Sequence, residues 1–397
     1  MKNKSGFQLK ELIIIVVITS LLTSLTTGVI MYNNNRITNH VSGSDLNQDE
    51  NLKEFLKVYA SLIGDYYTDF DKKGMLEEAM KAMFNYLGED YSDYLNKDET
   101  DSLASKLNGT YKGIGVQIVD QNIIYKVFPD SPAAEVGMQV GDKIVTINGE
   151  DTSSKTSDEV ASLIQNATGE KVALGVLRND SPIQFEIEVK TLLVPAINYQ
   201  LVDYGSKKIG YLAISTFSNT VAVQVKGALT NMESQGMDSL VIDLRNNTGG
   251  YLAQASEIAN FFLEEGKIIY SLAEKDTTEE FRDDTSEKRD YPVAIIMNEG
   301  TASASEILAA ALKDSYHRNV TLVGETSYGK GKVQQTRSLE DGSMVKYTTA
   351  RWLRPNGDCI DGVGIRPDVE VELLLPSEGE EVVDTQLKEA LRILGEV

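Results

Sequence analysis

The alternation of short apolar segments between residues 208 and 324 constrains the fold more than any other feature of the chain. Compact apolar runs alternate with longer segments whose apolar side chains recur at three- and four-residue spacing, as on one face of a helix. The expected strands are Ile209–Ile214, Ser239–Leu244, Val293–Met297 and Val320–Val323, and the expected helices are Val221–Gln235, Leu252–Leu263 and the apolar pattern Ile307, Leu308, Ala311 and Leu312. Strands that alternate with helices form layered structures, so this region predicts an α/β core.

The preceding region, from about residue 109 to residue 190, has a different pattern of short strands and glycine-containing turns. Asn148-Gly149 is typical of a tight turn, and one helix is expected at Ser157–Asn166. The expected strands are Ile114–Val119, Ile123–Val127, Lys143–Ile147, Lys171–Leu177 and Ile183–Val189. This region therefore predicts a separate, strand-rich domain.

The N-terminal part contains an apolar segment without charged residues, Leu12–Tyr32. This segment is long enough to cross a bilayer as a single helix. Lysines at positions 2, 4 and 10 precede it, so the positive-inside rule predicts residues 1–11 in the cytoplasm and the remaining chain outside. A cleaved signal peptide is the alternative, although its apolar region would be shorter and would end at a small-residue cleavage site.

Polar and amphipathic segments flank these domains. Residues 33–50 are rich in Asn, Ser and Asp and predict a linker, whereas residues 51–102 predict a helical region because apolar side chains recur at helical spacing. Residues 376–397 predict a helix with one apolar face. That face consists of Leu387, Leu391 and Leu394. Such short helices need a surface to cover, either on the chain's own domains or on a partner.

The composition excludes several classes of function. The net charge of −22 offers no basic surface, so no nucleic-acid partner is expected. Cys359 is the single cysteine and the chain has two histidines, so neither a metal site nor a cofactor is expected. A length of 397 residues with 41% hydrophobic residues is sufficient for two or three packed domains.

Ser305 lies where the last expected helix begins, after Glu299-Gly-Thr-Ala-Ser-Ala304. At this position the unpaired backbone N–H groups and the positive end of the helix dipole favour a developing anion. A serine before an apolar helix is most often an N-cap. The alternative is a nucleophile whose oxyanion donor is the backbone N–H of Glu306.

A nucleophilic serine needs a base to take its proton. His40 lies in the polar linker and His317 lies near the end of the helix that Ser305 opens, so a Ser-His-Asp triad is not expected. Lys330 lies in a glycine-rich loop after the expected strand Val320–Val323, and a lysine can act as the base if burial lowers its pKa. Gln334 follows four residues later, where it can orient the amine.

The segments Ser303-Ala-Ser-Glu-Ile307 and Gly324-Glu-Thr-Ser-Tyr-Gly-Lys-Gly-Lys-Val-Gln334 resemble the carboxyl-terminal processing proteases, which are serine peptidases. The resemblance extends from about residue 50 to the C-terminus. It implies a crotonase- or ClpP-like arrangement of β and α layers in the core. It also implies four roles. Ser305 is the nucleophile, Lys330 is the base, Gln334 is the third member, and Gly249 or Gly250, between which the choice stays open, is a second backbone oxyanion donor beside the N–H of Glu306.

Three segments of residues 103–192 resemble a PDZ domain. They are Gly113-Ile-Gly-Val116, Asp130-Ser-Pro-Ala-Ala134 and Val140-Gly-Asp-Lys-Ile-Val-Thr-Ile-Asn-Gly149. A PDZ domain adds an extended peptide to the edge of its sheet and holds the C-terminal carboxylate with backbone N–H groups. The implied peptide-binding residues are Gly113, Ile114, Gly115, Val116, Ile118, Val160 and Ile164. Because strands alternate faces, half of the apolar residues in this region belong to the core instead.

These features together predict a membrane-anchored, extracytoplasmic serine endopeptidase with an inserted PDZ domain and a protease core at residues 193–375. Its expected substrates are proteins with exposed, apolar C-termini, near which it cleaves. The resemblance also implies a homodimer built from the N-terminal helical region and the C-terminal helix. Two alternatives are a non-catalytic PDZ scaffold on an inactive core, and a ligand-binding relative of the core that needs neither the Ser-Lys pair nor a PDZ domain.

Overall fold

The computed structural model describes residues 48–167, 171–316, 320–373 and 383–396. The predicted anchor Leu12–Tyr32 lies outside these residues, as do His40 and His317. Within the described ranges, no helix is both long enough and apolar enough to cross a membrane. The chain divides into two compact units, with the boundary between Ala79 and Met80.

The described part of the first unit is helical. Helix α3 (Glu50–Asp65) begins after Asp49, whose side chain accepts hydrogen bonds from the backbone N–H groups of Asn51 and Leu52. Helix α4 (Lys72–Tyr86) follows and runs across the boundary between the units, and α5 (Lys97–Leu107) lies in the second unit. Helices therefore occupy most of residues 51–102, although the strand β1 (Asp93–Leu95) also lies within this range.

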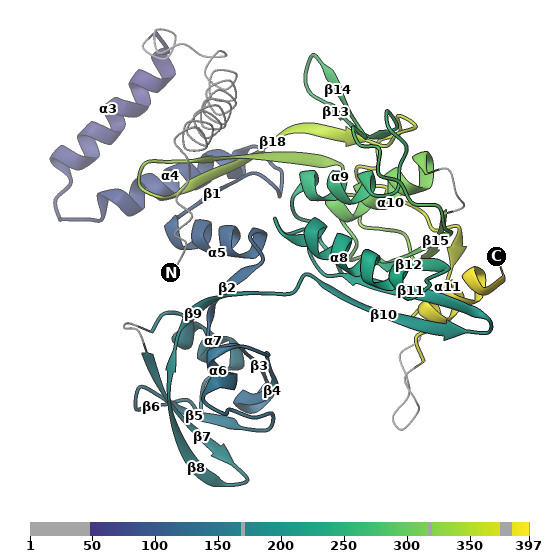
Figure 1. Cartoon of the computed structure of the whole chain (residues 1–397). Coiled ribbons are helices and arrows are strands. Elements are labelled where there is room, and N and C mark those ends of the chain that lie inside the picture. The colour runs from purple at the N-terminus through teal and green to yellow at the C-terminus, as the bar shows by residue number, and fades with distance from the viewer. Residues whose placement is uncertain (1–47, 168–170, 317–319, 374–382, 397) are drawn as a thin grey trace, which may run out of the picture. The chain divides into compact units, whose positions relative to one another are not determined.

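The centre of the second unit is a six-stranded sheet (Figure 1). In spatial order its strands are β10 (Ile197–Tyr204), β11 (Lys207–Ile214), β12 (Ser239–Asp243), β15 (Val293–Met297), β16 (Val320–Gly324) and β19 (Val369–Glu370). All neighbouring pairs are parallel except the hairpin of β10 and β11. Strands β12 and β15 are buried along their whole length, as parallel strands covered on both faces must be. This arrangement confirms the predicted α/β core.

Helices cover both faces of this sheet. Helices α8 (Val221–Ser234), α9 (Leu252–Asn260) and α10 (Ala304–Ser315) pack on the face that includes Leu212, Ile242 and Ile295. Helix α11 (Thr385–Glu396) packs on the opposite face, where Leu387, Leu391 and Leu394 join Val241, Ile296 and Val323 in a second cluster. The apolar face expected on this last helix is therefore covered by the chain's own sheet.

A second sheet of the core is antiparallel. It contains β1 (Asp93–Leu95), β13 (Ile268–Ala273), β14 (Thr278–Arg282), β17 (Lys332–Ser338) and β18 (Met344–Leu353). Strand β14 lies within the highly charged segment of residues 274–290 and pairs with β13. The ring of Phe281 also stacks on Tyr270 at 4.6 Å between centroids, in addition to the backbone pairing of the two strands.

The predicted PDZ region is a separate six-stranded sheet with its own apolar core. Its elements are β3 (Val116–Val119), the 3-10 turn η1 (Asp120–Asn122), β4 (Ile123–Val127), α6 (Pro132–Glu135), β5 (Lys143–Ile147), β6 (Glu150–Asp151), α7 (Ser157–Gln165), β7 (Lys171–Arg178) and β8 (Ser181–Glu188). Strands β2 (Thr110–Gly113) and β9 (Lys190–Leu193) pair at its base. Strand β3 begins at Val116 rather than at Ile114, because Gly115 adopts a φ of +91°, outside the extended region of a regular strand.

Candidate active site

Ser305 lies in the first turn of α10 and is completely buried. The preceding Ser303 has a φ of +59°, so the chain makes a sharp turn before the helix begins. The hydroxyl of Ser305 donates a hydrogen bond to the carbonyl oxygen of Asn247 at 2.9 Å. The serine is thus held at a helix N-terminus, as the sequence predicts, with its hydroxyl directed to a backbone carbonyl.

The segment of residues 246–250, which we call the Asn247 loop, packs against this turn. The side chain of Asn247 is buried, donating to the carbonyl of Ile214 at 2.8 Å and accepting from the N–H of Gly249 at 2.9 Å. We call residues 301–305 the serine turn. Gly249 lies so close to it that a Cβ would come within 2.8 Å of the carbonyl oxygen of Ala302. Glycine is therefore required there by close backbone approach, beyond its role in a strand-to-helix turn.

Glu306 contributes more than the backbone N–H that the sequence predicts, because its buried carboxylate accepts four hydrogen bonds. Within the serine turn the donor is the N–H of Ser303 at 2.8 Å. The other donors belong to the segment of residues 325–331, which we call the lysine loop. They are the hydroxyl of Ser327 at 2.6 Å and the N–H groups of Gly329 at 2.7 Å and Lys330 at 2.9 Å. One carboxylate thus joins the serine turn to the lysine loop.

The carboxylate of Glu306 lies deep in the protein, and burial raises its pKa while the four donated hydrogen bonds lower it. The sequence pattern Ser303-Ala-Ser-Glu306 contains the capping-box spacing, in which a glutamate at the third helical position reaches back to the N-cap. That pattern could have identified the contact with Ser303. It could not have identified the contacts with the lysine loop.

Lys330 is half-buried, and burial lowers the pKa of its amine, with a further lowering by the positive charge of Lys346. Its carbonyl oxygen accepts a hydrogen bond from the indole of Trp352 at 2.8 Å, and its ammonium lies 4.5 Å from the centre of the Tyr91 ring. Among the described residues, no hydrogen bond joins Lys330 to Ser305. The structure brings both motifs to one site but holds the serine hydroxyl on Asn247.

Gln334 lies on β17, and its side-chain amide donates to the hydroxyl of Thr348 at 3.2 Å. Thr348 in turn lies 2.8 Å from a carboxylate oxygen of Glu89, which also pairs with Lys332 at 3.5 Å. In the part of the chain that the structure describes, Gln334 makes no hydrogen bond to Lys330. Glu89, Tyr91, Thr348 and Trp352 were not predicted from the sequence, since no local motif marks them.

The predicted peptide-binding residues lie together in the PDZ domain. The side chains of Ile114, Val160 and Ile164 are buried in its core, which agrees with the expectation that part of this set is structural. Val116 and Ile118 lie on β3, which is the edge strand of the sheet. Gly113 ends β2, and Gly115 has no room for a side chain because a Cβ would lie 2.1 Å from that of Ser131.

Groups of three or more His, Cys, Asp or Glu side chains that could hold a metal ion do not occur among the described residues. The site itself offers a serine hydroxyl, a lysine amine and surrounding hydrogen-bond donors. A nucleophile beside a helix N-terminus with a base of lowered pKa is an arrangement suited to acyl transfer.

Comparison with known proteins places this geometry in a family. Residues 208–371 match peptidase family S41, and residues 123–178 match the PDZ domain. The chain is 34% identical over 369 residues to the "Probable CtpA-like serine protease" of Staphylococcus aureus strain N315, covering 91% of this chain and 72% of that protein. It is 32% identical over 353 residues to the protein of the same name from Staphylococcus haemolyticus, covering 87% and 70%.

Two solved structures share the fold. The photosystem II D1 C-terminal processing protease superposes with a TM-score of 0.50 and 24% identity, over 86% of this chain and 91% of that one. A putative S41 protease from Bacteroides fragilis superposes with a TM-score of 0.53 and 19% identity, over 84% and 91%. At these identities the structural similarity shows the fold alone, and the assignment to a family rests on the staphylococcal relatives. The chain is a serine-type peptidase that belongs to the CtpA-like serine proteases of peptidase family S41.

Proposed function

We propose that this peptidase is a membrane-anchored, extracytoplasmic endopeptidase that cleaves proteins near their C-termini with Ser305 as nucleophile and Lys330 as base. The observation that carries the catalytic part is the carboxylate of Glu306. It accepts hydrogen bonds both from the serine turn and from the backbone N–H of Lys330 at 2.9 Å. Two motifs 25 residues apart are thereby fixed beside each other at one helix N-terminus.

In the proposed reaction the amine of Lys330 takes the proton of the Ser305 hydroxyl as the oxygen attacks the scissile carbonyl. The hydroxyl first leaves the carbonyl of Asn247, to which it donates in the resting structure. The lysine then returns the proton to the leaving amine, and water releases the acyl group by the same steps. Burial supports this role, because it lowers the pKa of Lys330 and so increases the fraction of neutral amine.

The oxyanion donors in this proposal are the backbone N–H of Glu306 and one from the Asn247 loop. The N–H of Gly249 already donates to the side chain of Asn247 at 2.9 Å. No hydrogen bond among the described residues uses the N–H of Gly250, whose φ of +145° only glycine adopts readily. These observations favour Gly250 as the second donor.

Substrate selection is assigned to the PDZ domain. Its strand β3 lies at the sheet edge beside α7, which supports addition of an extended peptide to this strand with the terminal carboxylate near residues 113–116. An apolar peptide with a free carboxylate should bind at least tenfold more tightly than the same peptide with a C-terminal carboxamide. Equal affinity, measured by calorimetry, would exclude recognition of the carboxylate.

The anchor at residues 12–32 and the homodimer remain part of the proposal. The apolar face of α11 covers the chain's own sheet, so a dimer would need other surfaces, such as α3 with its exposed Phe55 and Leu62. Fractionation of cells that produce the full chain, followed by protease treatment of intact wall-free cells, tests the location. Degradation of the folded domains is expected.

Hydrolysis of an unfolded protein such as casein by the chain from residue 36 onward tests the catalytic proposal. Ser305→Ala should abolish the activity while the protein stays folded, because only a hydroxyl is lost. Ser315→Ala is the matched control, since it removes a hydroxyl at the other end of α10 that bonds to the carbonyl of Ile268. Undiminished hydrolysis by Ser305→Ala would exclude this serine as nucleophile. Equal loss in both variants would indicate damage to the helix instead.

A further inference from the structure

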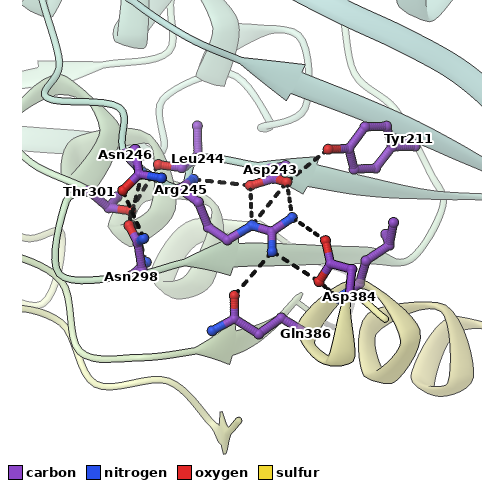
Figure 2. Close-up of polar contacts among 10 residues, drawn as sticks. Tyr211, Asp243, Leu244, Arg245, Asn246, Asn298, Thr301, Asp384 and Gln386 are labelled. Carbon is purple, nitrogen blue, oxygen red and sulfur yellow. Dashed lines mark hydrogen bonds and ion pairs between the residues drawn. The ribbon is translucent and has the colours of Figure 1, made fainter. Parts of the chain in front are cut away.

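A polar cluster on the far side of the core sheet connects α11 to the active site, although the sequence separates them widely. Arg245 follows the last residues of β12 and directly precedes the Asn247 loop. Its guanidinium contacts residues of β12 and residues at the start of α11 (Figure 2). We call this the Arg245 cluster. Its members are Tyr211, Asp243, Arg245, Asp384 and Gln386.

Each contact in the Arg245 cluster is within hydrogen-bonding distance. Arg245 donates to both carboxylate oxygens of Asp384, at 2.7 and 3.0 Å, and to the side-chain oxygen of Gln386 at 3.2 Å. It also donates to Asp243 at 2.5 Å, and Asp243 accepts from the hydroxyl of Tyr211 at 2.8 Å. A guanidinium that is satisfied on two sides in this way has a fixed position. The backbone that follows it is fixed with it.

The fixed backbone leads directly to the serine turn. The next residue, Asn246, receives a hydrogen bond at its side-chain oxygen from Asn298 at 3.0 Å and donates its N–H to Asn298 at 2.9 Å. Thr301 then donates its hydroxyl to the carbonyl of Leu244 at 2.8 Å. Figure 2 shows this second group of contacts beside the Arg245 cluster. The Asn247 loop and the serine turn are thus both connected to the segment that carries Arg245.

Gln386 also reaches the lysine loop. Its side chain is completely buried, and its amide donates to the carbonyl of Val371 at 2.8 Å and to the carboxylate of Glu325 at 3.3 Å. Glu325 is the first residue after β16, at the beginning of the lysine loop. One buried side chain at the start of α11 therefore touches the residue that precedes the Asn247 loop and the residue that opens the lysine loop.

We propose that Asp384 and Gln386 are positioning residues for catalysis, which set the relative placement of the Asn247 loop and the lysine loop from the start of α11. This inference rests on the proposed Ser305–Lys330 mechanism. Neither residue touches the reacting atoms. Asp384 acts on the site through Arg245, and Gln386 acts through both Arg245 and Glu325. Small displacements of a donor or base reduce the rate strongly, because catalysis depends on placement within fractions of an ångström.

The test compares three variants in the protein that hydrolyses the substrate. Asp384→Asn keeps the shape of the side chain but removes its charge, and Gln386→Met keeps the volume but removes the amide. The control is Arg392→Gln, on the exposed side of the same helix, which loses ion pairs to Glu389 and Glu396. On a short chromogenic peptide, kcat should fall at least tenfold in the first two variants, with KM within twofold of the parent. The control should keep both constants within twofold.

Two outcomes would overturn the inference. If Asp384→Asn lowers only the melting temperature and leaves kcat within twofold well below that temperature, the contacts merely attach the helix. If Gln386→Met does not fold, Asp384→Asn alone decides, because the side chain of Asp384 is one-third exposed and tolerates the change.

The second outcome concerns the route by which Asp384 acts on the site. Combined with Arg245→Gln, the Asp384→Asn change should add little further loss, whereas multiplied effects would show that Asp384 does not act through Arg245.

The proposed function is tested separately in the same assay. An inactive parent, or a Ser305→Ala variant as active as the parent, counts against the Ser305–Lys330 mechanism. An active parent whose α11 variants retain full kcat counts only against the role of α11.

Discussion

The two halves of the candidate site are held in different ways. On the serine side, the contacts come from backbone groups and from one short stretch of chain. The Ser305 hydroxyl bonds to the carbonyl of Asn247, and Gly249 packs against Ala302. On the lysine side, the contacts come from side chains of other strands and loops. These include the ring of Tyr91, the indole of Trp352 and the charge of Lys346.

This difference indicates which property each half controls. Backbone contacts fix the position of Ser305, the proposed nucleophile, and they change little when side chains are substituted. Side-chain contacts fix both the place and the protonation of the lysine, because its pKa depends on burial and on neighbouring charges. Substitutions around Lys330 should therefore change the pH dependence, whereas substitutions in the serine turn should remove the activity at every pH.

The largest effect is expected for the base itself. Lys330→Arg retains the positive charge but should be as inactive as Ser305→Ala, because a guanidinium is effectively never deprotonated in proteins. Hydrolysis of casein across a range of pH values measures this. Lys332→Arg is the control, since arginine at that position can keep the ion pair with Glu89. An active Lys330→Arg enzyme would show that another group takes the proton.

A somewhat smaller loss is expected when the connection between the two halves is weakened. Glu306→Gln leaves one acceptor oxygen where the carboxylate has two, and it turns an amide donor toward backbone donors that include the N–H of Lys330. A buried donor left without an acceptor costs about 1–3 kcal/mol. If that cost displaces the lysine loop from its catalytic position, kcat should fall by roughly 5- to 150-fold. Glu299→Gln, an exposed change just before the serine turn, should have no effect. Unchanged kcat in Glu306→Gln would mean that the carboxylate does not determine the geometry.

The sequence predicted the positions of Ser305 and Lys330 better than it predicted the residues that contact Lys330. Ser305, the start of its helix and the loop around Lys330 are local features of spacing and glycine content. The partners of the lysine are not local. Tyr91 lies 239 positions before Lys330, and Glu89 joins Gln334 only through Thr348 across a strand pair. No periodicity predicts such contacts.

The helices show the same limit. The pattern of α11 and the pattern of α3 both indicate an apolar face. In the structure α11 buries Ala390 and Leu394 against the sheet, whereas α3 has no buried side chain. Amphipathic spacing therefore predicts that a helix has an apolar face but not which surface covers it. Strand β14 (Thr278–Arg282) lies in a segment rich in charged residues that has no alternation of apolar side chains, so no sequence pattern indicates it.

A moderate effect is expected for the connection between Gln334 and Glu89. Thr348→Val keeps the shape of the side chain but removes the hydroxyl that bonds to both residues. If this connection holds Gln334 in place beside the lysine loop, kcat should fall by roughly three- to tenfold, about 0.7–1.4 kcal/mol. Thr349→Val, the neighbouring position on β18, is the matched control. Equal activity of the two variants would show that Thr348 does not position Gln334 for catalysis.

The smallest effect, and the one most specific to the lysine half, is expected for Lys346→Gln. The charge of Lys346 lowers the pKa of Lys330, so its removal should raise that pKa. In the proposed mechanism the neutral amine is the active form, so activity should rise with pH through the pKa of Lys330. The rising limb of kcat/KM should therefore move to more alkaline pH, on the order of half a pH unit. The rate on the alkaline plateau should stay unchanged, since the base and the nucleophile are intact. Arg351→Gln removes a positive charge from an exposed position of the same strand and should not move the limb. A shift toward acidic pH would contradict the assignment, because it would require the titrating group to lose its proton more readily when a neighbouring positive charge is removed.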